Sequence, residues 1–242
     1  MSWHPPQEAE ILQVVDATWP AARYVENGPF TLRIGQGGGQ RVSAASANGP
    51  ARAAEISAAE SAMRAMGQKQ LFMIAGKDKV LDDRLAALGY RVKDPVSMFA
   101  APAKMLAMHE QKGLVASRAV APLAVMKTLW GQGGIGPGRL AVMARARGAK
   151  TYLLGRVGES PAGVAYVAMH GQTAMLHALE VAPAARRKGL GQALSAAAAA
   201  WAVEQGAETF SLIAVTANAA ACGLYRHLGM VKVGNYHYRI KD

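Results

Sequence analysis

The chain has 242 residues, 51% of them hydrophobic, which is enough for a packed core in one large domain or two small ones. Its formal net charge is +11, but residues 1–105 hold 12 basic and 10 acidic side chains, whereas residues 106–242 hold 15 and 6. The positive excess therefore lies in the C-terminal half, without a long basic run interleaved with aromatic residues, which argues against nucleic acid as a partner and favours a small anionic ligand.

An internal repeat relates the two halves of the chain. Residues 71–92 align without a gap with residues 211–232, at an offset of 140. The aligned pairs include Phe72 with Leu212, Asp78 with Asn218, Leu88 with Leu228 and Gly89 with Gly229. Each copy has the pattern of a strand, a helix and the start of a second strand, and two copies of one such unit predict two copies of one domain.

The rest of the first copy carries turn signals and no ligand-binding motif. A glycine cluster at residues 35–39 lies between the segments 31–34 and 40–46, and is typical of a hairpin turn between two strands. Residues 105–113 have the composition of a helical or irregular linker. We therefore expect the second copy to begin soon after this linker.

The second copy begins with helical and glycine-rich segments. Apolar spacing predicts helices over residues 117–130 and 139–147, joined by the glycine loop 131–138. This loop contains a Gly-x-Gly-x-x-Gly spacing, but it follows a helix rather than a strand and runs directly into Pro137. We therefore interpret it as a flexible connection and not as a dinucleotide site. Residues 152–157 and 163–169 then predict a β-hairpin.

The next segment points to a ligand. A predicted strand over residues 174–181 breaks at Pro183, and a basic loop (Arg186, Arg187 and Lys188) leads through Gly189 into an alanine-rich helix over residues 189–205. A glycine-containing loop at a helix N-terminus presents free backbone N–H groups and the positive end of the helix dipole, which suit a pyrophosphate. The loop is not a Walker motif, because no Gly-Lys-Ser/Thr follows the glycines, and it lacks the third glycine of the dinucleotide motif.

The chain closes with a second strand–helix–strand unit. Residues 209–215 have the pattern of a buried strand, residues 218–228 that of a helix, and residues 230–240 that of a last strand. Asn218 is a favourable residue for capping the helix N-terminus, and Gly229 is a typical C-terminal stop.

These two segments resemble motifs of the GNAT superfamily, the acetyl-CoA-dependent N-acetyltransferases. The first is Arg-x-x-Gly-x-Gly, formed by Arg186, Gly189 and Gly191. The second is similar to the family's Asn-x-x-Ala-x-x-Leu-Tyr-x-x-Leu-Gly-Phe segment, and its residues here are Asn218, Ala221, Leu224, Tyr225, Leu228 and Gly229, with Met230 in place of the usual Phe. Together the motifs cover about residues 173–232, in the family's order of strand, loop, helix, strand and helix.

The resemblance implies an α/β (α+β) fold, the GNAT fold, with a mixed, mostly antiparallel sheet flanked by helices and two tandem copies. Residues 1–108 are then a degenerate GNAT-like domain, because they lack the Arg-x-x-Gly-x-Gly motif and have Leu85 where the second copy has Tyr225. Residues 114–242 are the predicted catalytic domain.

The resemblance also implies how acetyl-CoA would be held. In the family, the strand before the phosphate loop carries a bulge, and its freed N–H groups hold the pantetheine arm and the thioester oxygen. The expected acetyl-CoA contacts are Leu179, Glu180, Val181, Arg186, Arg187, Lys188, Gly189, Leu190, Gly191, Gln192 and Asn218. Tyr225 matches the family's tyrosine that donates a proton to the sulfur of CoA, and a phenol with a pKa of about 10 is protonated at neutral pH.

The proton acceptor stays open between His177, Glu180 and water. His177 matches a histidine of the arylalkylamine N-acetyltransferases, and an imidazole with a pKa near 6.5 suits a base, although a satisfied structural histidine fits the pattern equally well. Met175 stands where several relatives have a glutamate or histidine. Strand alternation puts Glu180 opposite His177, unless a bulge intervenes. No metal-ligand set is visible.

The predicted function is therefore transfer of an acetyl group from acetyl-CoA to an amine by direct attack. The alternatives are a regulatory protein that binds acyl-CoA without turnover, and an acetyltransferase acting on RNA or on protein lysines. Cys222 is the single cysteine, and neither a signal peptide nor an apolar run of membrane-spanning length is present, so we expect a cytoplasmic protein without a membrane partner. A monomer and a homodimer are both compatible with the sequence.

Overall fold

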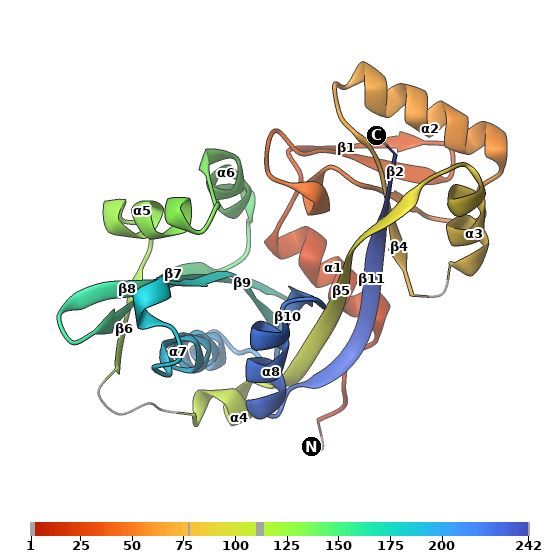
Figure 1. Ribbon diagram of the computed structural model, residues 1–242. Coiled ribbons are helices and arrows are strands. Elements are labelled where there is room, and N and C mark those ends of the chain that lie inside the picture. The colour runs from red at the N-terminus through yellow and green to blue at the C-terminus, as the bar shows by residue number, and fades with distance from the viewer. Residues whose placement is uncertain (1–2, 77, 110–113, 242) are drawn as a thin grey trace.

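The structure is a computed structural model that describes residues 3–76, 78–109 and 114–241. Its described strands form one 11-stranded sheet in the order β1-β2-β3-β4-β11-β5-β10-β9-β8-β7-β6 (Figure 1). The strands are β1 Arg23–Asn27, β2 Phe30–Ile34, β3 Ala45–Ala47, β4 Gln70–Ala75, β5 Arg91–Pro102, β6 Leu114–Ala119, β7 Lys150–Val157, β8 Ser160–His170, β9 Thr173–Val181, β10 Thr209–Val215 and β11 Val231–Lys241. The helices are α1 Glu8–Thr18, α2 Ala53–Ala65, α3 Lys79–Ala87, α4 Ala103–Ala107, α5 Ala124–Gln132, α6 Pro137–Arg145, α7 Leu190–Glu204 and α8 Ala219–His227.

The internal repeat is present in the structure with the offset that the sequence predicts. The helices α3 and α8 begin and end 140 residues apart, and β5 and β11 begin 140 residues apart. Asp78 and Asn218 cap the two helices in the same way, each accepting a hydrogen bond from the backbone N–H three residues further on. Gly89 and Gly229 end the helices with φ of +84° and +78°, a left-handed conformation that favours glycine.

The two halves exchange their last strands. β5 of the first half pairs with β10 and β11 of the second half, and β11 in turn pairs with β4 and β5. These three pairings are all antiparallel, and each joins one half to the other, so β5 and β11 find their partners in the opposite half. Figure 1 shows the two long strands crossing the middle of the molecule side by side. The division into residues 1–108 and 114–242 stays a prediction, since one sheet runs across it.

The sheet is mixed and mostly antiparallel, as predicted. Two pairs are parallel, β3 with β4 and β9 with β10, and they occupy equivalent places in the two halves. Helices cover both faces: α7 packs on β7, β8 and β9, and α1 and α5 pack on β8 and β9 from the opposite side (Figure 1). Thus α1, which belongs to the first half of the chain, covers strands of the second half.

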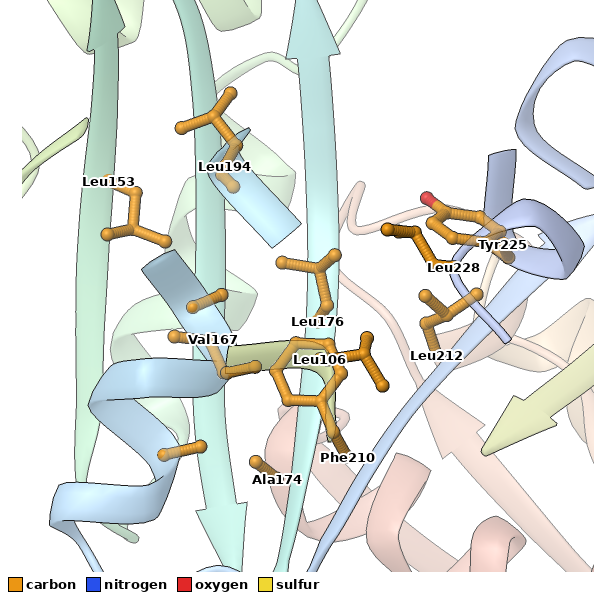
Figure 2. Packing of buried hydrophobic residues seen from close by; sticks show 14 of the residues in the cluster. Leu106, Leu153, Val167, Ala174, Leu176, Leu194, Phe210, Leu212, Tyr225 and Leu228 are labelled. Atoms are coloured by element: carbon orange, nitrogen blue, oxygen red, sulfur yellow. The ribbon is translucent and has the colours of Figure 1, made fainter. Parts of the chain in front are cut away.

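The largest core cluster lies between α7 and the sheet. Leu153, Val167 and Leu176 project from three neighbouring strands toward Leu194 and Phe210, and all of these side chains are buried (Figure 2). Burying each such side chain contributes about 1.5–3 kcal/mol relative to its exposure. Gly163 lets the helix approach, because a Cβ there would lie 2.9 Å from Leu194 Cδ1. This packing fixes the start of α7 relative to β9.

Two predicted elements are wrong over part of their length. Residues 117–119, predicted as helix, belong to β6, and the helix α5 begins only at Ala124. Pro122 explains the difference, because the residue before a proline is disfavoured in the α conformation. Residues 40–42, predicted as part of a strand, form a short 3-10 helix, and the strand β3 covers only Ala45–Ala47, of which Ser46 and Ala47 pair with β2. The predicted linker, residues 105–113, is helical up to Ala107, and residues 110–113 lie outside the described residues.

The remaining elements of the second half are confirmed. The hairpin is β7 and β8, the strand before the basic loop is β9, and the predicted bounds of β10 are those of the structure. The helices α7 and α8 differ from the predicted bounds by one residue at each end. Across the described part of the chain, every helix is too short or too polar to cross a membrane.

Candidate active site

A cavity opens where β9 and β10 separate. The two strands pair in parallel from Thr173 and Thr209 up to Leu176 and Leu212, and then diverge. The opening is a cavity of about 1030 Å³, lined by the separated ends of both strands, the start of α7 and one face of α8. We call it the β9–β10 cavity.

A bulge in β9 shapes one wall of the β9–β10 cavity. His177 pairs with Tyr166 and Glu180 with Val164, so that Ala178 and Leu179 together oppose the single residue Ala165. Ala178 has φ of +51°, an uncommon conformation for a residue with a side chain. The Trp130 indole N–H donates to the Ala178 carbonyl at 2.8 Å and thereby holds the bulge. The bulge that the sequence resemblance implied is therefore present.

The basic loop after β9 leads into α7, whose N-terminus lies at the cavity and has no side-chain cap. Gly189 caps the helix in the left-handed conformation, with φ of +82°, and Arg187 before it has φ of +64°. The first turn contains no acidic residue. Because the first N–H groups of a helix have no intrahelical acceptor, Leu190, Gly191 and Gln192 offer donors at the cavity wall. This end of the cavity suits a phosphate or pyrophosphate group.

Close approach at Gly191 connects α7 with the opposite wall. A Cβ at Gly191 would lie 3.2 Å from Leu224 Cδ2 and 3.9 Å from Leu179 Cδ2. The second glycine of the Arg-x-x-Gly-x-Gly motif therefore serves packing between α7, α8 and β9, whereas the first serves the left-handed cap.

Tyr225 projects from α8 into the same cavity. The side chain is buried, and Figure 2 shows its hydroxyl end directed away from α8 toward the strand that carries Leu176. Burial, with a smaller contribution from the neighbouring Cys222, raises the pKa of the Tyr225 hydroxyl to about 12. The phenol is therefore protonated at neutral pH and can act as a proton donor.

His177 is held by residues from the first half of the chain. Its ring is buried, Arg41 Nη1 lies 3.2 Å from Nδ1, and Thr18 Oγ1 lies 2.8 Å from Nε2. Because a guanidinium only donates, Nδ1 is the acceptor and Nε2 carries the hydrogen, which it donates to Thr18; the Thr18 hydroxyl in turn donates to the Val14 carbonyl. Burial, and secondly the charge of Arg41, hold the pKa of His177 well below its usual 6.5.

Glu180 lies beyond the bulge, at the cavity wall. Its carboxylate accepts from Arg186 Nη2 at 3.2 Å, while Arg186 Nε donates to the Val181 carbonyl at 3.1 Å. Gly133 leaves room for this carboxylate, because a Cβ there would lie 2.6 Å from Glu180 Cδ. The glycine loop, whose sequence pattern indicates a flexible connection, thus faces the Glu180 side chain at Gly133.

The structure brings almost all of the predicted site residues together. Every predicted catalytic or acetyl-CoA-binding residue except Lys188 lines the β9–β10 cavity. Lys188 is exposed in the basic loop and does not line it. Two lining arginines, Arg41 and Arg139, were missed, because neither belongs to a local motif and Arg41 comes from the other half of the chain. Among the described residues, no group of three or more His, Cys, Asp or Glu side chains is placed to hold a metal ion.

Comparison with known proteins identifies the domain. Residues 137–230 match the model of the "Acetyltransferase (GNAT) family". This segment is a GNAT-family domain. It contains the β9 bulge, the start of α7 and Tyr225, so the β9–β10 cavity belongs mainly to the GNAT domain.

Solved structures show the same fold over nearly the whole chain. A GCN5-related N-acetyltransferase from Kribbella flavida has a TM-score of 0.76 at 19% sequence identity, covering 96% of this chain and 95% of that one. A conserved protein of unknown function from Staphylococcus epidermidis has a TM-score of 0.72 at 13% identity, covering 93% and 96%. A tandem GNAT protein from the clavulanic acid biosynthesis pathway has a TM-score of 0.63 at 12% identity, covering 99% and 89%. No curated protein sequence matches the chain.

Proposed function

We propose that the protein transfers an acetyl group from acetyl-CoA to an amine by direct attack. The observation that carries the proposal is the β9–β10 cavity, which combines open N–H groups at the start of α7 with a protonated tyrosine on the facing helix. The pyrophosphate of acetyl-CoA would lie at the N-terminus of α7, beside Arg186 and Arg187. The pantetheine arm would follow the bulged part of β9 into the gap between the strands.

The proposed chemistry needs three groups at the inner part of the cavity. The amine nitrogen attacks the thioester carbon, the carbon–sulfur bond breaks, and Tyr225 donates its proton to the departing sulfur. Backbone N–H groups around Leu179 and Val181, beside the bulge, would stabilise negative charge on the carbonyl oxygen. A proton leaves the amine nitrogen in the same reaction and needs an acceptor.

The geometry favours Glu180 or a water molecule over His177 as that acceptor. Glu180 lines the cavity and pairs with Arg186, whereas the one free lone pair of the His177 ring already accepts from Arg41. His177 can take a proton only if Arg41 moves away. We therefore assign His177 a positioning role for Arg41 and Thr18.

The first experiment is calorimetry with acetyl-CoA, followed by thiol release across a panel of amines. We expect binding and amine-dependent release of CoA. The thiol dye should report only CoA, because Cys222 is the single cysteine and is buried, and a sample without acceptor measures any remaining reaction of the protein.

Tyr225→Phe separates catalysis from binding. Removing the proton donor should lower kcat by about 10²–10⁴-fold while acetyl-CoA still binds. Tyr24→Phe is the matched control, since Tyr24 lies on β1 away from the cavity. Acetyl-CoA binding without turnover on any acceptor would support a regulatory acyl-CoA-binding protein instead. Turnover only on RNA or protein lysines would support the macromolecular alternative. Cytoplasmic location and oligomeric state stay predictions.

A further inference from the structure

Two arginines at the β9–β10 cavity have no acidic partner. Arg41 comes from the loop after β2, and Arg139 comes from the first turn of α6. Neither takes part in any ion pair between the residues that the structure describes. The GNAT motifs include neither residue, so the proposed acetyl-CoA contacts leave both without a role.

Arg41 is held in place without being neutralised. One nitrogen donates to the neutral His177 ring at 3.2 Å, and the guanidinium lies 5.5 Å from the centre of the Trp19 ring. Its Nε is buried without a hydrogen-bond partner. Burying part of a permanent positive charge is costly unless an anion or a polar group compensates it. Because this guanidinium lines the cavity and keeps its positive charge, it is suited to an anionic ligand.

Arg139 is brought toward Arg41 by a glycine contact between the two halves. A Cβ at Gly138 would lie 2.3 Å from the Gly37 carbonyl oxygen, and a Cβ at Gly39 would lie 3.4 Å from Arg139 Nε. The chain therefore passes directly against α6, two residues before Arg41. A positive charge in the first turn of a helix opposes the helix dipole, so helix stability does not explain Arg139.

Arg41 lies away from the predicted pyrophosphate position. Arg41 contacts His177, where β9 begins to diverge from β10, whereas the basic loop begins only after Val181. Four residues of regular strand span about 13 Å, and the bulge makes this stretch of β9 somewhat shorter. The phosphate end and the Arg41 end of the cavity are therefore separate, and the bulge at Ala178 and Leu179 lies between them along β9.

We propose that the acceptor amine carries a carboxylate, and that Arg41 and Arg139 bind it at the inner end of the β9–β10 cavity. A guanidinium matches a carboxylate in shape and donates two parallel hydrogen bonds to it. The substrate class is thus an amino acid or a similar amino-carboxylate. This inference rests on the proposed acetyl transfer and adds its acceptor.

The experiment compares amino acids with the amines formed by removing their carboxylate: tyrosine with tyramine, lysine with cadaverine, histidine with histamine and phenylalanine with phenethylamine. The expected result is a higher kcat/KM for at least one carboxylate-bearing member than for its partner. Arg41→Gln and Arg139→Gln should each raise the KM of that acceptor by about tenfold to hundredfold. The neutral partner's KM and the acetyl-CoA Kd should stay unchanged.

Arg23→Gln is the matched control, because Arg23 is exposed on β1 outside the cavity. Arg139 is also exposed, so its variant remains informative if the Arg41 variant fails to fold. Preference for the neutral amines, or an equal loss of acetyl-CoA affinity in both arginine variants, would overturn the inference while acetyl transfer stands.

A binding measurement separates this inference from the proposed function. If no amine is acetylated, calorimetry of the same pairs with the CoA-loaded protein still shows whether the cavity binds the carboxylate-bearing members. Binding of a carboxylate-bearing member that is weakened in Arg139→Gln would support the anion site although transfer fails. Absence of binding by every carboxylate-bearing member would refute it.

Discussion

The starts of α2 and α7 occupy equivalent places in the two halves, but they differ in charge. The first turn of α2 contains an acidic residue, and the first turn of α7 contains none. In α2 the third helical residue is Glu55, whose carboxylate accepts from the Arg52 backbone N–H and pairs with its guanidinium. In α7 the third helical residue is Gln192, and the cap is Gly189. A carboxylate at a helix N-terminus fills the position where an anion would bind. The first half therefore has the same order of strands and helices, but a carboxylate occupies the start of α2.

The facing helices differ in the same sense. Leu85 on α3 is fully buried, whereas the equivalent Tyr225 on α8 presents a hydroxyl to the β9–β10 cavity. The strand before α2 is also only three residues long, while β9 has nine residues and a bulge. The same topology is therefore compatible with a cavity, as beside Tyr225, and with a filled core, as around Leu85.

The largest predicted effect comes from separating the halves. Each of β5 and β11 finds its partners in the opposite half, so residues 1–108 and 114–242 expressed alone each carry a last strand without partners. We expect neither piece to fold as a monomer, and the two together to form a complex in equal proportion. Circular dichroism and size-exclusion chromatography check this. A monomeric half with a cooperative thermal transition would instead support two independent domains.

The next prediction concerns the third residue of α7, where a carboxylate would match Glu55 in α2. Gln192→Glu places an acidic group at the third position of α7, where it suits the helix but repels the pyrophosphate. Acetyl-CoA affinity should fall by about tenfold to hundredfold, with an unchanged melting temperature. Calorimetry measures the affinity.

Gln13→Glu is the matched control for this change, since Gln13 is exposed on α1 and lies outside the cavity. Glu55→Gln should leave acetyl-CoA affinity unchanged as well. An equal loss of affinity in Gln13→Glu would mean that overall charge, and not the start of α7, governs binding.

The comparison also shows which features a sequence can reveal. The bounds of α7, β10 and α8 follow from Gly189, Asn218 and Gly229, because caps and stops act within one helical turn. The strand exchange was not predicted, since the pairing of β5 with β10 joins residues more than a hundred positions apart. The role of Arg41 was missed for the same reason: its contact with His177 exists only once the halves are joined.

The contact between the halves makes stability depend on pH. The pKa of buried His177 lies well below its usual 6.5. At a pH between the lowered pKa and 6.5, His177 therefore binds a proton in the unfolded chain but not in the folded one. The stabilisation is complete above pH 6.5 and is lost as the pH falls, by about 1.4 kcal/mol per pH unit. Arg41, Thr18, Trp19 and Tyr166 surround the ring.

Denaturant unfolding from about pH 8 to about pH 5 measures this dependence. His177→Gln should have a smaller slope below pH 6.5 than the unmodified protein, whatever stability it loses at pH 8. The difference in slope is decisive, because carboxylates elsewhere titrate equally in both proteins. Parallel curves would show that His177 is protonated in the folded state.

The smallest predicted effect comes from removing the two equivalent helix caps, one in each half, and comparing the results. Asp78 and Asn218 each accept from the backbone N–H three residues on, so Asp78→Ala and Asn218→Ala should each lower the free energy of unfolding by about 1 kcal/mol. Only Asn218 lines the β9–β10 cavity, and Tyr225 lies on the helix that it caps. Matched losses of stability with a lower kcat/KM in Asn218→Ala alone would assign activity to the second half. An equal loss of activity in both variants would mean that the first half takes part in the reaction, and would contradict the view that Glu55 and Leu85 have closed its site.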